Sequence, residues 1–343
     1  MKITRKTIPA LLLGSVLAAF SSEAANPDGF ARISPELAKR IQDKRELYRD
    51  TAKLEAWIAA LPPEIQAHPN VRYATPAGAD PRLTSLDVFH ARKAPASQPM
   101  VIFVHGGGFS AGDKSHAALV RNKALFFPAH GVVFVTVNYR LAPEVGHPAQ
   151  TGDLADAVAF VRAHAAEWGG DPDAIFLIGH SAGAQLVAQL VADRSLLSSR
   201  GIPARSLRGV ISADTQLFDI PAALSGARVE APLREIVEMV YGQSPESWRA
   251  ASPITHLTKG RDWPPLLLFH SGSGESPSAI AAKHFAEAWR AAGGDAEVQS
   301  SREKDHPSLG RDIGKPGDWI TETVMGFLSR NARPLIPVNP NRK

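Results

Sequence analysis

The chain has 343 residues, a formal net charge of +4 and no cysteine. The absence of cysteine excludes disulfide bonds, thiolate catalysis and cysteine-ligated zinc. The 38 basic and 34 acidic residues include no dense Lys/Arg cluster with interleaved aromatic residues, so nucleic acid is not an expected partner.

Residues 1–25 have the pattern of a secretory signal peptide. Three basic residues lie among the first six positions, an apolar run covers residues 9–20, and the small residues Ala24 and Ala25 follow. The apolar run is shorter than the roughly 20 residues that a membrane-spanning helix needs. We expect cleavage after Ala24 or Ala25, which leaves a net charge of about +2, and export to the periplasm or the medium. The alternative is an uncleaved N-terminal anchor; otherwise we expect no stable membrane span.

Residues 26–70 are predicted to form an accessory N-terminal segment. Ser34 followed by Pro35 is typical of a helix start, and the next two dozen residues are charged and amphipathic. Two interpretations stay open for this segment. It is a solvated surface helix, or it is part of a cap over an active site.

From about residue 71, apolar segments of strand length alternate with helical segments. The predicted strands are 86–90, 100–104, 132–137, 174–178, 207–211, 265–269 and 297–300, and the predicted helices are 151–168, 184–191, 278–292 and 319–331. Continuous apolar runs such as 100–104 are typical of strands buried on both faces. We therefore predict an α/β fold over residues 71–333, with a mostly parallel central sheet covered by helices on both faces.

Residues 212–263 interrupt this alternation between two predicted core strands. They include a helical piece around 233–241 and several Pro, Gly and charged residues. In open parallel sheets, ligands bind at the carboxyl ends of the strands, where such an insertion would lie. We predict that 212–263 forms a lid or a wall of the substrate pocket. The last residues, 334–343, are expected to be a loosely ordered tail.

The segment Gly179-His180-Ser181-Ala182-Gly183 lies between a predicted strand and a predicted helix. A serine flanked by glycines at a strand-to-helix turn is the pattern of a nucleophile elbow, which exposes the serine hydroxyl above the sheet. The helix N-terminus behind it favours developing negative charge. Ser181 is therefore the candidate nucleophile, although a turn without chemistry also fits the pentapeptide alone.

The segment His105-Gly106-Gly107-Gly108-Phe109 directly follows a buried strand. Glycines let backbone N–H groups face a cavity, so the N–H groups of Gly107, Gly108 and Ala182 are the candidate oxyanion donors. The competing interpretation is a phosphate-binding loop. It is disfavoured because Asp113 occupies the position after Gly112 where the Walker pattern requires lysine.

An activated serine also needs a base. His306 follows the predicted last core strand, on a late loop, and is the candidate base. His256, His270 and His284 are its rivals in this half of the chain. His270 ends a predicted strand and His284 lies on a predicted helix, so both are less suitable.

The base in turn needs a carboxylate that orients it. The loop 271–277, after the strand that ends at His270, contains one acid, Glu275. Asp262 precedes that strand, and Asp305 is adjacent to the base. Glu275 is therefore predicted as the third member of a Ser181–His306–Glu275 triad, in the chain order Ser, acid, His.

Together these residues resemble the α/β-hydrolase esterases of the hormone-sensitive-lipase and carboxylesterase type. The resemblance runs from about residue 86 to 328 and rests on several segments. They are HGGGF at 105–109, NYRLAP at 138–143, HPAQ at 147–150, GDP at 170–172, GHSAG at 179–183 and DHPSL at 305–309. The segments 231–235 and 251–256 look like the pocket region of kynurenine formamidases and related feruloyl and acetyl esterases. One departure concerns the acid, because the family usually shows His-Gly-x-x-Asp where this chain has His270-Ser271-Gly272-Ser273-Gly274-Glu275.

The resemblance implies an α/β-hydrolase fold and a serine esterase that cleaves a small-molecule carboxylic ester through an acyl-enzyme. Neither an organic cofactor nor a metal is expected. An arylformamidase-like amide hydrolase would use the same residues and is the first alternative. A hydrolase-fold binding protein without turnover is the second. The sequence predicts neither the acyl chain length nor the oligomeric state.

Overall fold

The structure, a computed structural model, describes residues 33–225 and 231–332. The expected signal peptide and the tail 334–343 lie outside these described residues. Within the described ranges, every helix is too short or too polar to cross a membrane.

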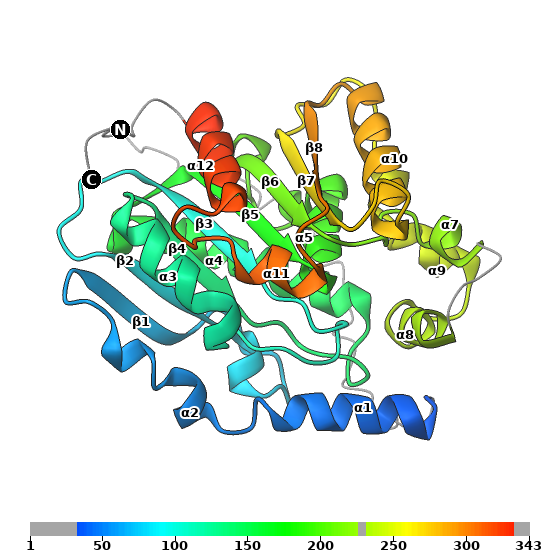
Figure 1. Cartoon of the computed structure of the whole chain (residues 1–343), viewed down its shortest axis with the longest axis horizontal. Coiled ribbons are helices and arrows are strands. Elements are labelled where there is room, and N and C mark those ends of the chain that lie inside the picture. The colour runs from blue at the N-terminus through cyan, green and yellow to red at the C-terminus, as the bar shows by residue number, and fades with distance from the viewer. Residues whose placement is uncertain (1–32, 226–230, 333–343) are drawn as a thin grey trace, which may run out of the picture.

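Strands and helices alternate through most of the chain (Figure 1). The strands are β1 (Ile65–Arg72), β2 (Ser85–Ala91), β3 (Gln98–Val104), β4 (Val133–Val137), β5 (Gly170–His180), β6 (Leu207–Ala213), β7 (Leu266–Ser271) and β8 (Ala296–Ser301). The helices before the insertion are α1 (Pro35–Glu46), α2 (Thr51–Glu55), α3 (Ala117–Ala129), α4 (His147–His164), α5 (Ala182–Ala192) and α6 (Arg194–Ser198). The later helices are α7 (Ile220–Ser225), α8 (Ala231–Tyr241), α9 (Pro245–Ala250), α10 (Pro277–Ala291), α11 (His306–Arg311) and α12 (Trp319–Asn331).

All of these strands form a single sheet in the order β1-β2-β4-β3-β5-β6-β7-β8. β1 and β2 run antiparallel to their neighbours, and every pair from β4 to β8 is parallel. The carboxyl ends of β3, β5, β6 and β7 therefore lie side by side. This edge of the sheet brings together the segments that follow those four strands.

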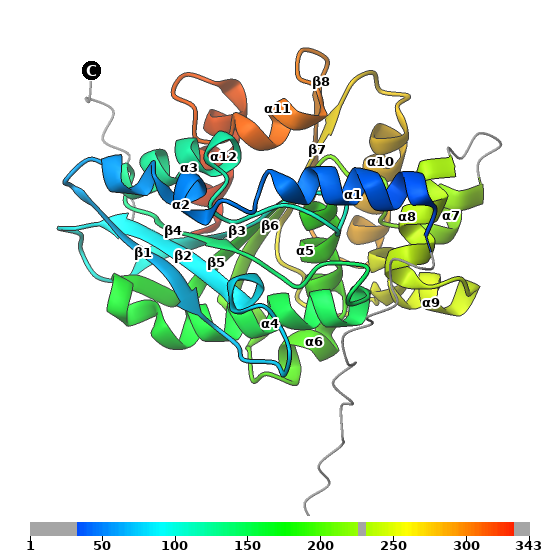
Figure 2. The ribbon, with the colours of Figure 1, turned by 90° about the horizontal axis from the view of Figure 1, so that it is seen from below.

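Helices cover both faces of the sheet, with α3, α11 and α12 on one side and α4, α5 and α6 on the other (Figure 2). The period of two along a strand explains how one strand serves both layers. In β3, Met100 and Ile102 pack in the core on the α4 and α5 side, whereas Val101 and Phe103 pack in the core on the α3 and α12 side. The predicted two-sided burial of this strand is confirmed.

The sheet begins earlier than the sequence indicates, because β1 (Ile65–Arg72) extends across the predicted boundary at residue 70. The alternation of β1 is weak. Its first residue, Ile65, is buried, but the rest of this edge strand is half-buried or exposed. Polar and proline residues such as His68 and Pro69 are tolerated on an edge strand, which packs on fewer neighbours.

Candidate active site

Ser181 lies at the sharp turn between β5 and α5. Its backbone has φ 57° and ψ −118°, a left-handed conformation that is strained for a residue with a side chain. The small flanking residues permit the turn, because a Cβ on Gly179 would collide with the backbone of Gly183. The turn predicted from the G-x-S-x-G pattern is therefore present, with Ser181 as the cap residue before α5.

His306 is the first residue of α11 and faces Ser181. Its Nε2 lies 3.0 Å from Oγ of Ser181, and its Nδ1 lies 2.8 Å from Oδ2 of Asp214. A carboxylate only accepts, so Nδ1 carries a proton and donates to Asp214, which leaves Nε2 to accept from the serine hydroxyl. Asp305 caps α11 by accepting from the N–H of Ser308 at 2.9 Å. The predicted pairing of Ser181 with His306 is thus found in the geometry.

The carboxylate beside His306 is Asp214, not Glu275, so the sequence-based choice of Glu275 is corrected. Asp214 follows β6 directly, whereas Glu275 lies exposed in the loop before α10. Since β6 and β7 are parallel neighbours with Ala213 aligned to Phe269, an acid after either strand emerges at the same edge of the sheet. In the sequence, Asp214 is marked only by its place three residues after the predicted strand 207–211.

Asp214 is held firmly. Its backbone has φ 60°, and its N–H donates to the carbonyl of Phe269 at 2.9 Å. Ser271 donates to its carboxylate through the backbone N–H at 3.0 Å and through the hydroxyl at 2.6 Å. Burial raises the pKa of Asp214, but hydrogen bonds from His306 and Ser271 outweigh burial and bring the pKa well below its ordinary value. The side chain is therefore a carboxylate at neutral pH.

The glycine loop, residues 105–110 after β3, lies against the elbow, the strand-to-helix turn at residues 179–183. A Cβ on Gly106 would lie 2.8 Å from Cβ of Ser181, so only glycine allows this approach. Gly107 and Gly108 have φ 123° and 64°, values that favour glycine. Among the hydrogen bonds of the described residues, none uses the N–H groups of Gly107 or Gly108. The N–H of Ala182, in the first turn of α5, has no acceptor within the helix, so all three predicted donors remain available.

The carbonyl groups of the glycine loop, in contrast, are tied to surrounding elements. Phe109 O accepts from the N–H of Ala142 at 2.9 Å and from Nε2 of Gln150 at 2.8 Å. Ser110 O accepts from Nε of Arg45 at 2.7 Å. Arg45 comes from α1, so the accessory N-terminal segment helps to fix the loop that carries the candidate oxyanion donors.

Arg45 also anchors α1 to the segment after β4. It forms a two-pronged pair with Glu144 at 2.7 and 2.8 Å and donates to the carbonyl of Ala142 at 2.8 Å. At the other end of α1, the N–H of Ser34 donates to Glu235 of α8 at 2.8 Å. The helix α1 therefore links the glycine loop to the insertion, which favours the interpretation of a cap over that of an isolated surface helix.

Asp113, at the position where a phosphate-binding loop has lysine, forms hydrogen bonds with neighbouring side chains. Its carboxylate accepts from Nε of Arg82 at 2.8 Å and from Nδ2 of Asn138 at 3.1 Å. The next residue, Lys114, is fully buried and forms an ion pair with the equally buried Asp87. Asp113 and Lys114 therefore belong to a buried polar network behind the glycine loop.

The insertion packs onto the site from the side of α4 and α5. Tyr241 of α8 contacts the ring of Phe109 edge-on, with centroids 5.5 Å apart, and lies 5.0 Å from the ring of His147. Gln185 of α5 donates to the carbonyl of Ala251 at 2.8 Å, and Gln189 donates to that of Ala250 at 3.0 Å. Phe109 belongs to the glycine loop, so the predicted insertion packs against this loop as well as against α4 and α5.

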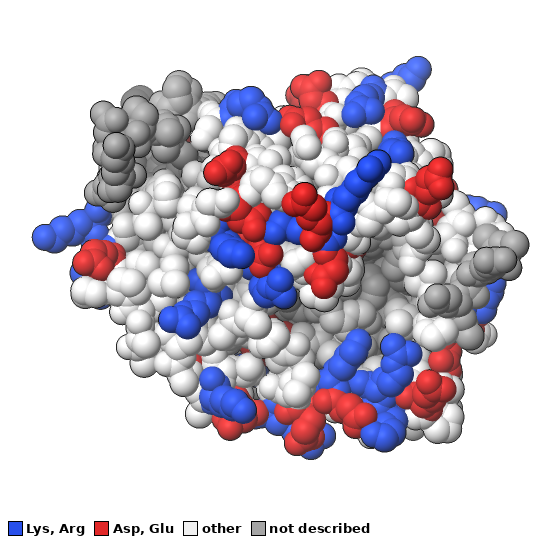
Figure 3. Space-filling model, in the orientation of Figure 1, with Lys and Arg blue, Asp and Glu red and all other residues white. Residues whose placement is uncertain are grey.

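On the face that carries α11, the surface is hollowed beside this helix, above α1 (Figure 3). Lys and Arg side chains gather over α1 along the lower edge of the hollow. The exposed cationic residues of α1 are Lys39, Arg40 and Lys44, of which Lys39 pairs with Asp43 at 2.7 Å. The side chain of His306, the first residue of α11, is 49% exposed, so the candidate site is open to solvent.

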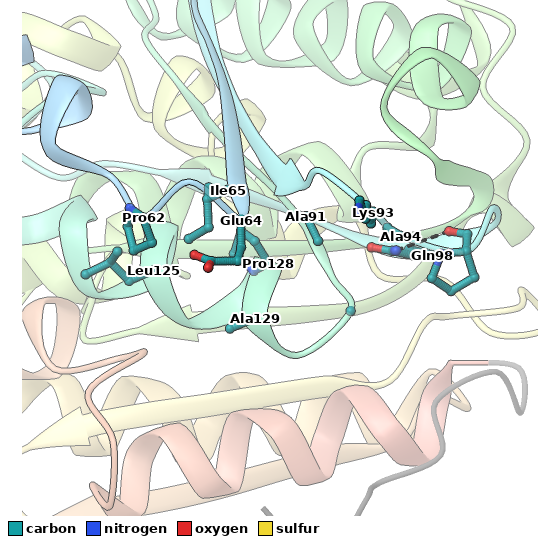
Figure 4. Close-up of a pocket in the computed structure, with 12 residues that line it drawn as sticks. Pro62, Glu64, Ile65, Ala91, Lys93, Ala94, Gln98, Leu125, Pro128 and Ala129 are labelled. Atoms are coloured by element: carbon teal, nitrogen blue, oxygen red, sulfur yellow. Dashed lines mark hydrogen bonds between the residues drawn. The ribbon is translucent and has the colours of Figure 1, made fainter.

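A separate groove of about 500 Å³ lies at the opposite edge of the sheet (Figure 4). It is lined by Gln98 at the start of β3, by Ala91 at the end of β2 and by Pro128 near the end of α3. Ser181 follows the carboxyl end of β5, so this groove is remote from the candidate site. Among the described residues, no group of three or more His, Cys, Asp or Glu side chains is arranged to hold a metal ion.

Comparisons with known proteins show the family and the fold of the chain. The BD-FAE family profile matches residues 86–287, which is more than half of the chain. The chain belongs to the BD-FAE family. The match includes the glycine loop, the elbow and Asp214, and it ends before His306.

Curated relatives of this BD-FAE member carry esterase names. It is 27% identical over 253 residues to the probable isoprenylcysteine alpha-carbonyl methylesterase ICMEL1 of Arabidopsis thaliana, covering 70% of this chain and 52% of that protein. It is 27% identical over 280 residues to esterase LipQ of Mycobacterium tuberculosis, covering 76% of this chain and 63% of that protein. The chain therefore spans about half to two-thirds of the length of these relatives.

Solved structures show the same fold. Esterase B from Lactobacillus rhamnosis matches this BD-FAE member with a TM-score of 0.65 and 20% identity, over 86% of this chain and 97% of the other. The apo form of Thermogutta terrifontis esterase 2 matches with a TM-score of 0.61 and 24% identity, over 80% of this chain and 97% of the other. The predicted α/β-hydrolase fold, with its mostly parallel sheet, is confirmed.

Proposed function

We propose that the protein is a serine hydrolase that cleaves carboxylic esters. The observation that carries this proposal is the continuous chain of hydrogen bonds from Oγ of Ser181 through His306 to Asp214, at 3.0 and 2.8 Å. The same nucleophile, base and orienting acid act together in the Ser-His-Asp hydrolases. The esterase names of the curated relatives support the same reaction class.

The geometry supports a two-step mechanism. Oγ of Ser181 attacks the ester carbonyl while Nε2 of His306 takes the hydroxyl proton, and Asp214 stabilises the imidazolium that forms. The oxyanion accepts hydrogen bonds from the N–H groups of Gly107, Gly108 and Ala182. In serine hydrolases, one such donor stabilises the transition state by about 3 kcal/mol. His306 then returns the proton to the departing alcohol.

The second step regenerates the enzyme. The covalent product of the first step is an ester of Ser181 with the acyl group. Water attacks this acyl-enzyme as His306 takes one of its protons, and the carboxylic acid leaves as Oγ regains a proton. The balance is one ester and one water consumed for one alcohol and one acid, so the reaction needs no redox partner.

The proposed substrates are small carboxylic esters, either esters with a short to medium acyl chain or aryl esters. The test is hydrolysis of p-nitrophenyl esters from acetate to palmitate, with methyl ferulate and N-formylkynurenine alongside. Turnover that falls by at least about 10⁴-fold in Ser181→Ala supports a serine esterase. A strong preference for the formamide would favour the arylformamidase alternative. No turnover by folded wild type would favour a binding protein.

We also propose that the chain is exported, on the signal-peptide pattern of residues 1–25. The test is expression of the full chain in a Gram-negative host, followed by fractionation and N-terminal sequencing. A periplasmic protein that begins after Ala24 or Ala25 supports the proposal. A full-length chain retained in the cytosol or in the membrane contradicts it.

A further inference from the structure

His180, the residue before the nucleophile, is unexplained by the proposed mechanism. It ends β5, its side chain is 7% exposed, and its Nε2 lies 2.8 Å from the backbone carbonyl of His306. A carbonyl only accepts, so Nε2 carries a proton and donates. The imidazole of His180 therefore holds the backbone of the candidate base directly.

The ring of His180 lies against two functional segments. A Cβ on Gly310 of α11 would lie 2.5 Å from Cγ of the ring, so glycine is required for this close packing. A Cβ on Gly106 of the glycine loop would lie 3.3 Å from Nδ1 of the same ring. Ser181 follows His180 in the chain. The ring thus contacts α11 and the glycine loop, and its backbone leads into the nucleophile.

The helix α11 has only six residues, so it contributes little rigidity of its own. Its later part is held from α3, where Nζ of the buried Lys123 donates to the carbonyl of Gly310 at 2.5 Å and to that of Leu119 at 2.6 Å. Its first residue, His306, is held by His180. The two anchors differ, because Lys123 fixes the body of the helix and His180 fixes the residue that performs the proton transfer.

We propose that His180 is a positioning residue that sets the angle and distance of the His306 imidazole relative to Ser181. The inference rests on the proposed serine hydrolase function, which it deepens. A shift of about 1 Å in such a group can cost a hundredfold in rate. Fixing the carbonyl of His306 restricts the ring without touching either ring nitrogen, so both nitrogens stay available for Asp214 and Ser181.

The charge state of His180 agrees with this role. Burial, with a smaller contribution from the neighbouring His306, lowers its pKa to about 4. The other charged groups that face it are Lys123 and Asp214. At neutral pH the ring is neutral, so it donates to His306 without placing a second positive charge beside the imidazolium that forms in catalysis.

The decisive pair of variants is His180→Gln and His180→Leu. Glutamine places an amide N–H near the position of Nε2, whereas leucine fills the volume without a donor. With p-nitrophenyl acetate, we expect His180→Leu to lower kcat between about tenfold and a hundredfold with KM changed by less than about twofold. We expect His180→Gln to recover most of kcat. His90→Asn, which removes a buried imidazole on β2 far from α11, is the control and should keep wild-type kcat.

Equal kcat in His180→Leu and wild type would overturn the proposal, as would an equal loss in the leucine and glutamine variants. A second measurement is independent of turnover. The proton on Nδ1 of His306 that is shared with Asp214 should give a far-downfield ¹H resonance in wild type and in His180→Gln. It should shift or broaden in folded His180→Leu, and an unchanged resonance there would contradict the inference. Wild type against Ser181→Ala, assayed first, tests the serine hydrolase function separately.

Discussion

Ser271, the last residue of β7, donates two hydrogen bonds to Asp214, the first residue after β6. The donors are its backbone N–H, 3.0 Å from Oδ1, and its hydroxyl, 2.6 Å from Oδ2. Because β6 and β7 are parallel neighbours, both residues lie at the same edge of the sheet. The sequence places the acid after β7. In the structure β7 instead supplies Ser271, whose donors hold Asp214, the acid that follows the neighbouring strand β6.

This arrangement predicts opposite outcomes for the two candidate acids. Asp214→Asn should lower kcat by about 10³- to 10⁴-fold, because an amide no longer fixes the productive tautomer of His306 or stabilises its charge. Glu275→Gln should leave kcat within about twofold, since Glu275 is exposed and outside the hydrogen-bond chain. The measurement is steady-state hydrolysis of p-nitrophenyl acetate, with circular dichroism to verify folding. A large loss of kcat in Glu275→Gln, with wild-type kcat in Asp214→Asn, would instead make Glu275 the acid of the triad.

The sequence predicts this site unevenly, for identifiable reasons. Ser181 and the glycine loop depend on short-range backbone geometry, so their patterns are contiguous and readable. His306 is recognisable in DHPSL after the last core strand. Asp214 was missed because its role depends on the proximity of two strand ends separated by 57 residues, as the contact between Asp214 and Ser271 shows. A pairing at that separation leaves no local pattern.

The outline of the fold is predictable for a different reason. Strands buried on both faces, such as 100–104, are continuously apolar and stand out from helices. The edge strand β1 has no such pattern, because only Ile65 is well buried. The role of α1 is equally hidden in the sequence, since it depends on the hydrogen bonds of the partly buried Arg45, and charge alone does not distinguish Arg45 from the exposed Lys39.

The contacts of Arg45 predict that α1 supports catalysis from outside the site. Arg45→Ala removes donors to the carbonyls of Ser110 and Ala142 and leaves Glu144 without its partner. We expect kcat to fall several-fold through loosening of the glycine loop, and the free energy of unfolding to fall by about 1–3 kcal/mol. Urea denaturation and ester hydrolysis measure the two effects.

The matched control is Lys39→Ala, which breaks a pair on the same helix whose side chains are 74% and 63% exposed. Exposed pairs contribute about 0–1 kcal/mol, so stability and kcat should stay near wild type. If Arg45→Ala and Lys39→Ala behave alike, α1 is only a surface helix and the cap interpretation fails.

The close approach of Gly106 to the elbow gives a steric prediction. In Gly106→Ala the new Cβ would lie 2.8 Å from Cβ of Ser181 and 2.9 Å from the carbonyl of His180, so the glycine loop must move away. Displaced oxyanion donors should lower kcat by about 10²-fold, with a smaller change in KM. Gly152→Ala in α4 is the control, because its Cβ meets only Arg200 at an ordinary 3.5 Å. That variant should be active and slightly more stable, since alanine favours the helix by about 1 kcal/mol.

Buried histidines predict how stability depends on pH. Burial, with a smaller contribution from the nearby His256, lowers the pKa of His147 to about 3, and burial with a contribution from His306 lowers that of His180 to about 4. An unfolded histidine has a pKa of about 6.5. Between about pH 4 and 6.5 the unfolded chain therefore binds protons that the folded chain does not. The free energy of unfolding rises with pH across this window, so stability is complete above about pH 6.5 and is lost as the pH falls.

Urea denaturation at steps from pH 7 to 4.5 measures this slope. In His147→Phe, which keeps an aromatic ring against Tyr241, the slope should decrease by up to about 1.4 kcal/mol per pH unit, the value for one proton. His284→Gln, on the exposed side of α10, should keep the wild-type slope. Asp214 contributes little above about pH 5, because its folded pKa is lowered and the unfolded aspartate, with a pKa of about 3.9, is then almost fully ionised. A slope in His147→Phe equal to that of wild type would show that His147 is protonated in the folded protein, against the burial of its ring.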